Sequence, residues 1–190
     1  METLLCRPRA SAAASAPSGA VLVLTDVYGV RDAKNQRWVA AFSEATGLPV
    51  IAPDLFRGVP WSDSKFGGDT KSQAYEKWRN DHFVPERVVS DIASAAVFAR
   101  ETAGQKDSPT QVPLAAVGFC FGGGRLLEAI ADADLRGKLT SAVAFYPTRV
   151  KDTANRSKLS ETPLLIIQVR WFLANTLHIF ACPHALESRL

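Results

Sequence analysis

Cysteine is scarce in this sequence, and no familiar metal-binding spacing is present. The three cysteines, Cys6, Cys120 and Cys182, are too few and too far apart for a disulfide framework or a zinc site. Neither an H-E-x-x-H motif nor a pair of C-x-x-C motifs occurs. The sequence therefore excludes a small disulfide-stapled domain, and we expect no metal in its sites.

No hydrophobic run is long enough for a transmembrane helix, although hydrophobic residues make up 47% of the chain. The most apolar stretch, residues 164–186, is interrupted by Arg170, Asn175 and His178. The 22 basic residues barely outnumber the 19 acidic ones, and no basic cluster is dense enough for a nucleic-acid groove. We therefore expect one globular domain with no membrane span and no nucleic-acid partner.

The first 19 residues are rich in alanine and serine and carry Arg7 and Arg9. They lack the apolar core of a secretory signal. Two interpretations remain open: a disordered tail before the first strand, or part of an organelle-targeting segment. We expect a cytoplasmic protein on the first interpretation and an organelle-targeted one on the second.

Short apolar runs alternate with helical patterns through the rest of the chain. Runs typical of buried parallel strands occupy residues 20–25, 49–52, 114–118, 141–146 and 164–168. Helices are expected over residues 35–46, 72–79, 85–102 and 122–133. This alternation predicts an α/β fold, with a mostly parallel, twisted sheet covered by helices on both faces.

The chemically informative segment lies where the strand at residues 114–118 gives way to a helix. A nucleophile on such a turn, here Cys120, is pushed out at the top of the sheet. Gly118 and Gly122 lie two positions on either side, where the strand and helix backbones approach closely. The helix N-terminus favours a thiolate, so we expect Cys120 to be the most thiolate-like cysteine. The alternative is a buried structural cysteine in a tight turn.

Three segments resemble the dienelactone hydrolase family, within the α/β-hydrolase fold. They are VLVLTDVYGVRDAKNQRWVAAFSEATGLPVIAPDLFRG at residues 21–58, VGFCFGGG at 117–124, and AVAFYP at 142–147 followed by PLLIIQ. The resemblance predicts a hydrolase-like domain over residues 20–168, between a tail of residues 1–19 and a divergent tail of residues 169–190. It implies an incomplete α/β-hydrolase fold that cleaves a small ester or lactone through a Cys-centred acyl-enzyme and needs no cofactor.

The resemblance also implies roles for individual residues. Cys120 matches the nucleophile, and Gly118, Gly122 and Gly123 form the tight turn around it. The backbone N–H groups of Phe121 and Val27 match the donors to the oxyanion. Asp26 stands where the family has a glutamate that interacts with the resting thiol. Because aspartate is one methylene shorter, Asp26 is equally well interpreted as a turn carboxylate.

The family's acid and histidine are missing from their expected positions. No aspartate occurs after Asp152, and Glu187 is the sole glutamate beyond the fifth strand. His178 and His184 follow that strand too closely to stand after another strand, and His82 lies in an irregular segment. We identify no triad acid or histidine. The chain is therefore either a hydrolase of this type or an inactive truncated isoform or pseudoenzyme, acting as a binding or redox-sensitive thiol protein.

Aromatic and cationic residues in the middle of the chain are candidates for a pocket over the sheet. Such residues would bind a carboxylate and a ring or acyl group; the alternative is surface arginines and ordinary core aromatics. The candidates are Arg57, Trp61, Tyr75, Trp78 and Arg79.

The last 22 residues show neither strand nor helix periodicity, and Pro183 interrupts them. The resemblance ends at Gln168, and we consider the hypothesis that the tail is read from an unspliced intron or a shifted frame. On that hypothesis the tail does not complete the sheet. An open sheet edge would then promote self-association.

Overall fold

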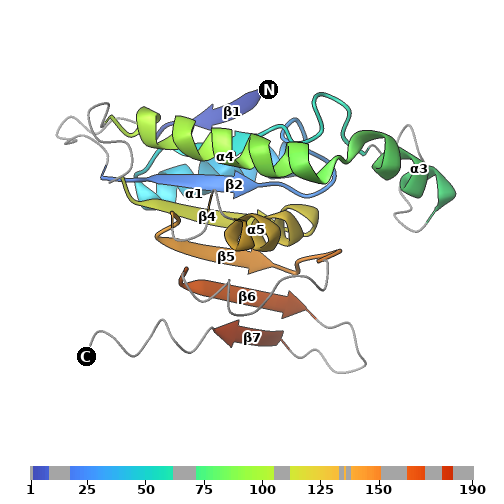
Figure 1. The fold of residues 1–190 in the computed structure, drawn as a ribbon. Helices are drawn as coiled ribbons and strands as arrows, with labels where there is room; N and C mark the ends of the chain where they lie inside the picture. Colours follow the sequence, from blue (N-terminus) through green and yellow to red (C-terminus); the bar gives the residue numbers. More distant parts are fainter. Residues whose placement is uncertain are drawn as a thin grey trace.

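The computed structural model describes residues 2–8, 18–61, 72–104, 112–132, 135, 138–150, 162–169 and 177–181, with the backbone alone for Val169 and residues 177–181. Within this part of the chain, a seven-stranded sheet has the order β1-β3-β2-β4-β5-β6-β7 (Figure 1). The strands are β1 (Thr3–Cys6), β2 (Ala20–Leu24), β3 (Val50–Pro53), β4 (Leu114–Phe119), β5 (Ser141–Phe145), β6 (Leu164–Val169) and β7 (Leu177–Ala181). The central strands β3, β2, β4, β5 and β6 run parallel to one another. Strands β1 and β7 pair antiparallel at the two edges.

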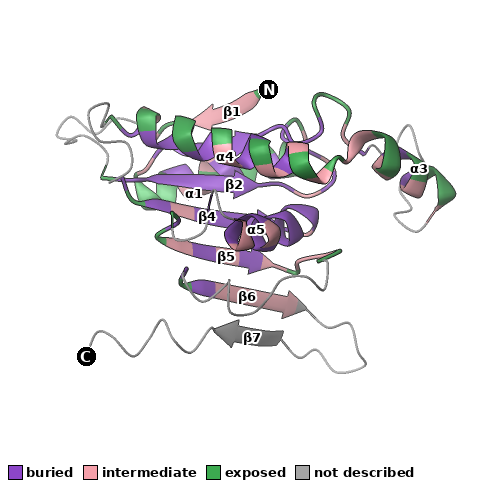
Figure 2. Ribbon diagram, in the orientation of Figure 1, coloured by how far each residue is buried: buried purple, intermediate pink, exposed green. Residues whose placement is uncertain are grey.

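Helices cover both faces of this sheet, as the sequence predicted. They are α1 (Ala33–Thr46), α3 (Gln73–His82), α4 (Pro85–Thr102) and α5 (Phe121–Ala131). Helices α4 and α5 lie on the face toward the viewer in Figure 1, and α1 lies behind the sheet. The fold is therefore α/β, with burial greatest in β2, β3, β4 and α5 (Figure 2).

Two apolar clusters form because alternate residues of each strand point to opposite faces. Leu22 and Leu24 of β2 belong to the larger cluster, which also contains the buried faces of α4 and α5. Val21 and Val23 belong to the smaller cluster beneath α1. Burial on both faces explains why the central strands are continuously apolar in sequence.

The ends of helix α1 are fixed by local sequence. Asp32 caps its N-terminus, accepting hydrogen bonds from the backbone N–H groups of Lys34 and Asn35. Gly47 ends it in a left-handed conformation with φ 68°. These signals place α1 directly after the loop that follows β2.

The structure differs from the sequence prediction at both ends of the sheet. Residues 3–6, expected in a disordered or targeting tail, form β1 and pair with β3. Residues 177–181, expected outside the sheet, form β7 and pair with β6. Each of these strands supplies partners to the backbone N–H and C=O groups of the strand beside it, which would otherwise lack them. Backbone pairing of this kind does not require alternating hydrophobic residues, so the sequence pattern did not reveal it. Residues 9–17 and 182–190 of the two tails lie outside the described residues.

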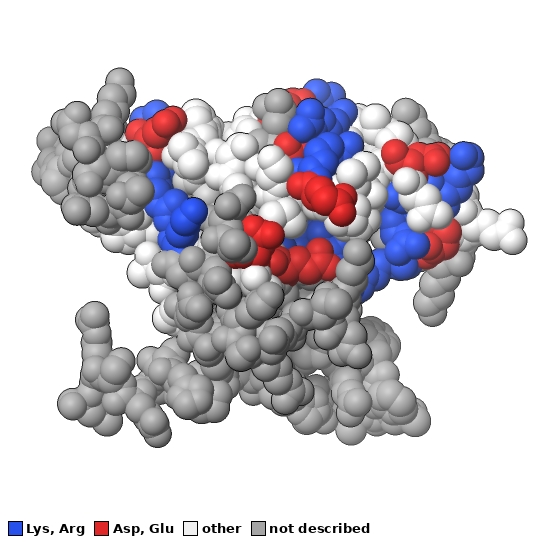
Figure 3. Space-filling view, viewed as in Figure 1, with Lys and Arg blue, Asp and Glu red and all other residues white. Residues whose placement is uncertain are grey.

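Charged side chains are interspersed on the face that carries α3 and α4 (Figure 3). Within the described ranges, no helix has both the length and the apolar character needed to cross a membrane. The same part of the chain holds no group of three or more histidine, cysteine or acidic residues arranged for a metal ion.

Candidate active site

Cys120 lies in the turn between β4 and α5 and has the backbone conformation φ 50°, ψ −113°. A non-glycine residue with positive φ is strained, and such strain concentrates at functional sites. The turn is held by its own backbone: Cys120 N–H donates to the Phe145 carbonyl at 3.0 Å, and the Cys120 carbonyl accepts from Gly124 N–H at 3.1 Å. The chain therefore enforces an unfavourable conformation at the residue that the sequence singled out.

Glycines make this turn possible because neighbouring backbones leave no room for a side chain. A Cβ on Gly122 would lie 2.2 Å from the Leu24 carbonyl oxygen, and one on Gly118 would lie 2.7 Å from the Gly122 carbonyl oxygen. A Cβ on Gly123 would meet the Gly118 carbonyl oxygen at 3.1 Å. Gly118 and Gly122 are therefore needed for the close approach, and Gly123 occupies a tight position beside them.

Gly124 belongs to the same set, although the sequence analysis did not assign it a role. A Cβ there would lie 2.1 Å from the carbonyl oxygen of Thr148, a residue in the loop after β5. The sequence signal that could have identified it is its place as the third glycine of the GGG run. Gly124 lets the loop after β5 close over the start of α5.

The two predicted oxyanion donors lie on neighbouring strand ends. Phe121 is the first residue of α5, and Val27 is buried in the turn after β2. Strands β2 and β4 are paired with Leu24 opposite Gly118, so their carboxyl ends meet at one edge of the sheet. The structure therefore brings Val27 and Phe121 to the same edge as Cys120.

Burial raises the pKa of the Cys120 thiol above its ordinary value. The Thr148 hydroxyl, whose Oγ1 lies 3.7 Å from Sγ, and the Phe121 N–H lower this pKa but do not outweigh burial. The charge of Asp26 raises it further, and Arg149 lowers it. Desolvation of the sulfur therefore works against the thiolate that the helix N-terminus favours.

Asp26 acts as a turn carboxylate, one of its two interpretations from sequence. Its Oδ1 accepts hydrogen bonds from Tyr28 N–H at 3.0 Å and from Asn35 Nδ2 at 2.8 Å. Burial raises its pKa, while these two hydrogen bonds lower it. Asp26 influences Cys120 through its charge, as noted above, and within the described residues no hydrogen bond joins the two side chains.

The candidate substrate-binding residues divide between the core and ion pairs. Trp61 and Trp78 are 1% and 3% exposed, and their ring centroids lie 5.6 Å apart. Arg57 pairs with Asp91 at 2.7 Å, and Arg79 pairs with a glutamate of its own helix. The two tryptophans are core residues, because burying large rings against one another outweighs exposing them. Their burial agrees with the second interpretation from sequence, ordinary core aromatics.

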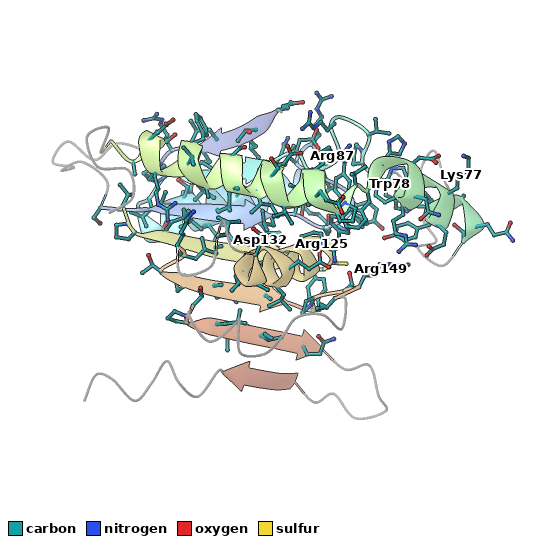
Figure 4. All side chains as sticks on the ribbon, in the orientation of Figure 1. Lys77, Trp78, Arg87, Arg125, Asp132 and Arg149 are labelled. Carbon is teal, nitrogen blue, oxygen red and sulfur yellow. The ribbon has the colours of Figure 1, made fainter. Side chains whose placement is uncertain are left out.

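A cluster of charged residues that the sequence analysis missed lies beside Cys120. Arg125 of α5 donates to the Arg149 carbonyl at 2.8 Å, and Arg149 Nη2 lies 2.7 Å from Glu76 Oε1 on α3 (Figure 4). The Arg149 guanidinium also lies 5.2 Å from the ring centroid of Tyr75. Glu76, Arg125 and Arg149 are far apart in sequence and follow no motif, so pattern analysis offered no signal for them.

Among the described side chains, no histidine contacts Cys120. The His82 ring lies 6.3 Å from that of Trp78. His178 lies in β7, where it pairs with Gln168 of β6, and β7 is three strands away from β4 in the sheet. At about 4.8 Å per strand, this separation is about 14 Å, beyond hydrogen-bond reach. His184 lies outside the described residues.

Comparison with known proteins agrees with this geometry. The model of the dienelactone hydrolase family matches residues 1–170. Among solved structures, a Klebsiella pneumoniae subsp. pneumoniae protein assigned as a dienelactone hydrolase superposes with TM-score 0.58 at 20% identity, covering 85% of this chain and 64% of that one. No curated protein matches the chain by sequence.

Two further structures share the fold. A dienelactone hydrolase-like promiscuous phosphotriesterase from metagenomic libraries has TM-score 0.54 at 20% identity, covering 82% of this chain and 59% of that one. An alpha-beta serine hydrolase homologue from Coxiella burnetii has TM-score 0.54 at 17% identity, covering 87% and 66%. This chain thus spans less than two thirds of the length of the Klebsiella protein. With the family match over most of its length, the chain belongs to the dienelactone hydrolase family.

Proposed function

We propose that this protein hydrolyses a small ester or lactone through an acyl-enzyme on Cys120. The observation that carries the proposal is the positive φ of Cys120 at the strand–helix turn, enforced by glycines with no space for a Cβ. This geometry supports a nucleophile presented at the edge of the sheet where Val27 and Phe121 also lie. Family membership supports the reaction class.

In the proposed reaction the Cys120 sulfur attacks the carbonyl carbon of the substrate, and the thiol proton passes to solvent. The negative charge that develops on the carbonyl oxygen is stabilised by backbone N–H groups of Phe121 and Val27. The tetrahedral intermediate collapses and expels the alcohol portion, which takes a proton from water. Attack by water on the resulting thioester then releases the acid and restores the thiol.

Two features of the site predict that this reaction is slow. Burial raises the pKa of the Cys120 thiol, which lowers the fraction of thiolate at neutral pH. No described histidine side chain contacts the sulfur to accept its proton or to activate water for the second step. We therefore expect acylation to outpace hydrolysis of the thioester. The competing proposal, a thiol protein without turnover, predicts no acyl-enzyme.

The experiment is a burst assay with p-nitrophenyl acetate. The wild-type protein should release one equivalent of p-nitrophenolate per chain and then turn over slowly, with one acetyl group on the Cys120 peptide by mass spectrometry. Cys120→Ala should abolish both signals, while Cys6→Ala, which removes a cysteine in β1, should keep them. Absence of an acetylated Cys120 peptide in the wild type would leave the thiol-protein alternative.

A further inference from the structure

The loop of residues 146–149, which we call the β5 loop, lies against Cys120 and is strained at two positions. Tyr146 has φ 37° and Arg149 has φ 54°, both unfavourable for residues with a side chain. Such conformations persist only where surrounding contacts enforce them. The contacts of the β5 loop therefore show what the fold is holding in place.

Backbone hydrogen bonds fix the first part of the loop. Tyr146 N–H donates to the Ile167 carbonyl at 2.6 Å, and Thr148 N–H donates to the Cys120 carbonyl at 3.0 Å. The Thr148 carbonyl also occupies the space that a Cβ on Gly124 would fill, so the loop lies close against α5. The backbone of Thr148 is thus fixed relative to the turn that carries Cys120.

Arg125 fixes the end of the loop from inside the protein. Its side chain is 3% exposed, pairs with Glu128 at 2.7 Å and donates to the Arg149 carbonyl at 2.8 Å. The guanidinium lies 4.7 Å from the ring centroid of Phe83 and 5.0 Å from that of Phe121, favourable for a cation over aromatic faces. Burying an arginine raises the free energy of the folded state unless its N–H groups find acceptors. One of these N–H groups donates to the β5 loop.

These contacts place the hydroxyl of Thr148 beside the sulfur of Cys120. Thr148 Oγ1 lies 3.7 Å from Cys120 Sγ, within hydrogen-bonding distance for sulfur. We propose that the Thr148 hydroxyl controls the reactivity of the Cys120 sulfur, and that Arg125 is the positioning residue that holds it there through the β5 loop. The inference rests on the proposed function, in which Cys120 is the nucleophile.

Other groups also act on the sulfur, and a test must leave them in place. Asp26 follows β2, Tyr75 lies on α3, and Tyr146 and Arg149 lie in the β5 loop; each interacts electrostatically with Cys120. Thr148→Val removes the hydroxyl at nearly constant shape and touches none of these groups. Thr148→Ser keeps the hydroxyl and serves as its partner variant.

The first experiment is the rate of Cys120 alkylation by iodoacetamide as a function of pH, measured on the full chain. Loss of a hydrogen bond to the thiolate should slow Thr148→Val about tenfold near neutral pH, with the rates converging at high pH. Thr148→Ser should keep the wild-type profile. Thr102→Val, where the hydroxyl bonds the Phe98 carbonyl within α4, controls for the substitution itself. A wild-type profile for Thr148→Val would overturn the proposal.

The second experiment tests the role of Arg125 by a double-mutant cycle. Arg125→Met should slow alkylation in the wild-type background but have little further effect in the Thr148→Val background, because both act on the same hydroxyl. Equal effects in both backgrounds would show that Arg125 is merely structural. Arg125→Lys retains a donor for the Arg149 carbonyl and should restore part of the rate, so it replaces Arg125→Met if that variant does not fold.

These measurements use no ester, so they are separable from the test of the proposed function. A Thr148-dependent alkylation profile without an acetylated Cys120 would overturn the hydrolase proposal and keep this inference. An acetylated Cys120 whose alkylation rate does not depend on Thr148 would keep the hydrolase proposal and overturn this inference.

Discussion

At the scale of single residues, burial decides the chemistry of this site more than sequence position does. Cys120 occupies the place where a helix N-terminus favours a thiolate, yet desolvation raises the pKa of its thiol. Asp26 shows the same effect, since burial raises the pKa of its carboxyl despite two hydrogen bonds to Oδ1. The motif singles out Cys120 as the candidate nucleophile, but burial is a property of the folded chain and is absent from the motif.

The raised pKa of Asp26 predicts a pH-dependent stability. A carboxyl group whose pKa is higher in the folded than in the unfolded state binds more protons when folded, so stability falls as pH rises from the ordinary aspartate value through the raised one. Asp26→Asn keeps an Oδ1 acceptor for both Tyr28 N–H and Asn35 Nδ2, and it removes the charge. Urea denaturation should therefore find this variant more stable than the wild type at pH 7, with the difference vanishing at low pH. A pH-independent difference would contradict this account.

At the scale of elements, the helices were predictable because their signals are local. Helix α4 begins at Pro85 and keeps one apolar face, as its sequence indicates. The candidate site was predictable only around Cys120, because the spacing of the glycines that flank it is visible in the sequence. Thr148, Arg125 and Arg149 escaped prediction because their roles arise from contacts between α5, α3 and the β5 loop, which no local pattern encodes.

The N-terminus of α1 offers a test of one such local signal. Asp32 is its N-cap and accepts from Lys34 N–H at 2.9 Å and Asn35 N–H at 3.2 Å. Asp32→Ala leaves both donors without their acceptor and should lower the free energy of unfolding by about 1 kcal/mol. Asp32→Ser restores a capping oxygen and should recover most of the loss. Equal destabilisation by both substitutions, measured by urea denaturation, would show that the cap is not the cause.

At the scale of the whole molecule, the parallel centre of the sheet follows from sequence and its edges do not. The central runs are continuously apolar, so they predict buried strands, whereas β1 and β7 owe their pairing to the neighbours they cover. The family match over residues 1–170 includes β1 and ends before β7. The prediction of self-association through an open sheet edge therefore turns on whether β7 stays paired with β6.

Removing β7 should make that edge available. A chain ending at Val169 would leave the outer backbone groups of β6 unpaired, and exposed strand edges promote association. We expect this variant to sediment as larger species than the full chain in analytical ultracentrifugation and to melt at a lower temperature. A chain ending at Ala181 keeps β7 and should behave as the full chain does, which separates the loss of the strand from the loss of chain length. Identical sedimentation and melting of all three would mean that β7 adds nothing to the sheet, as expected if residues 169–190 are foreign to the fold.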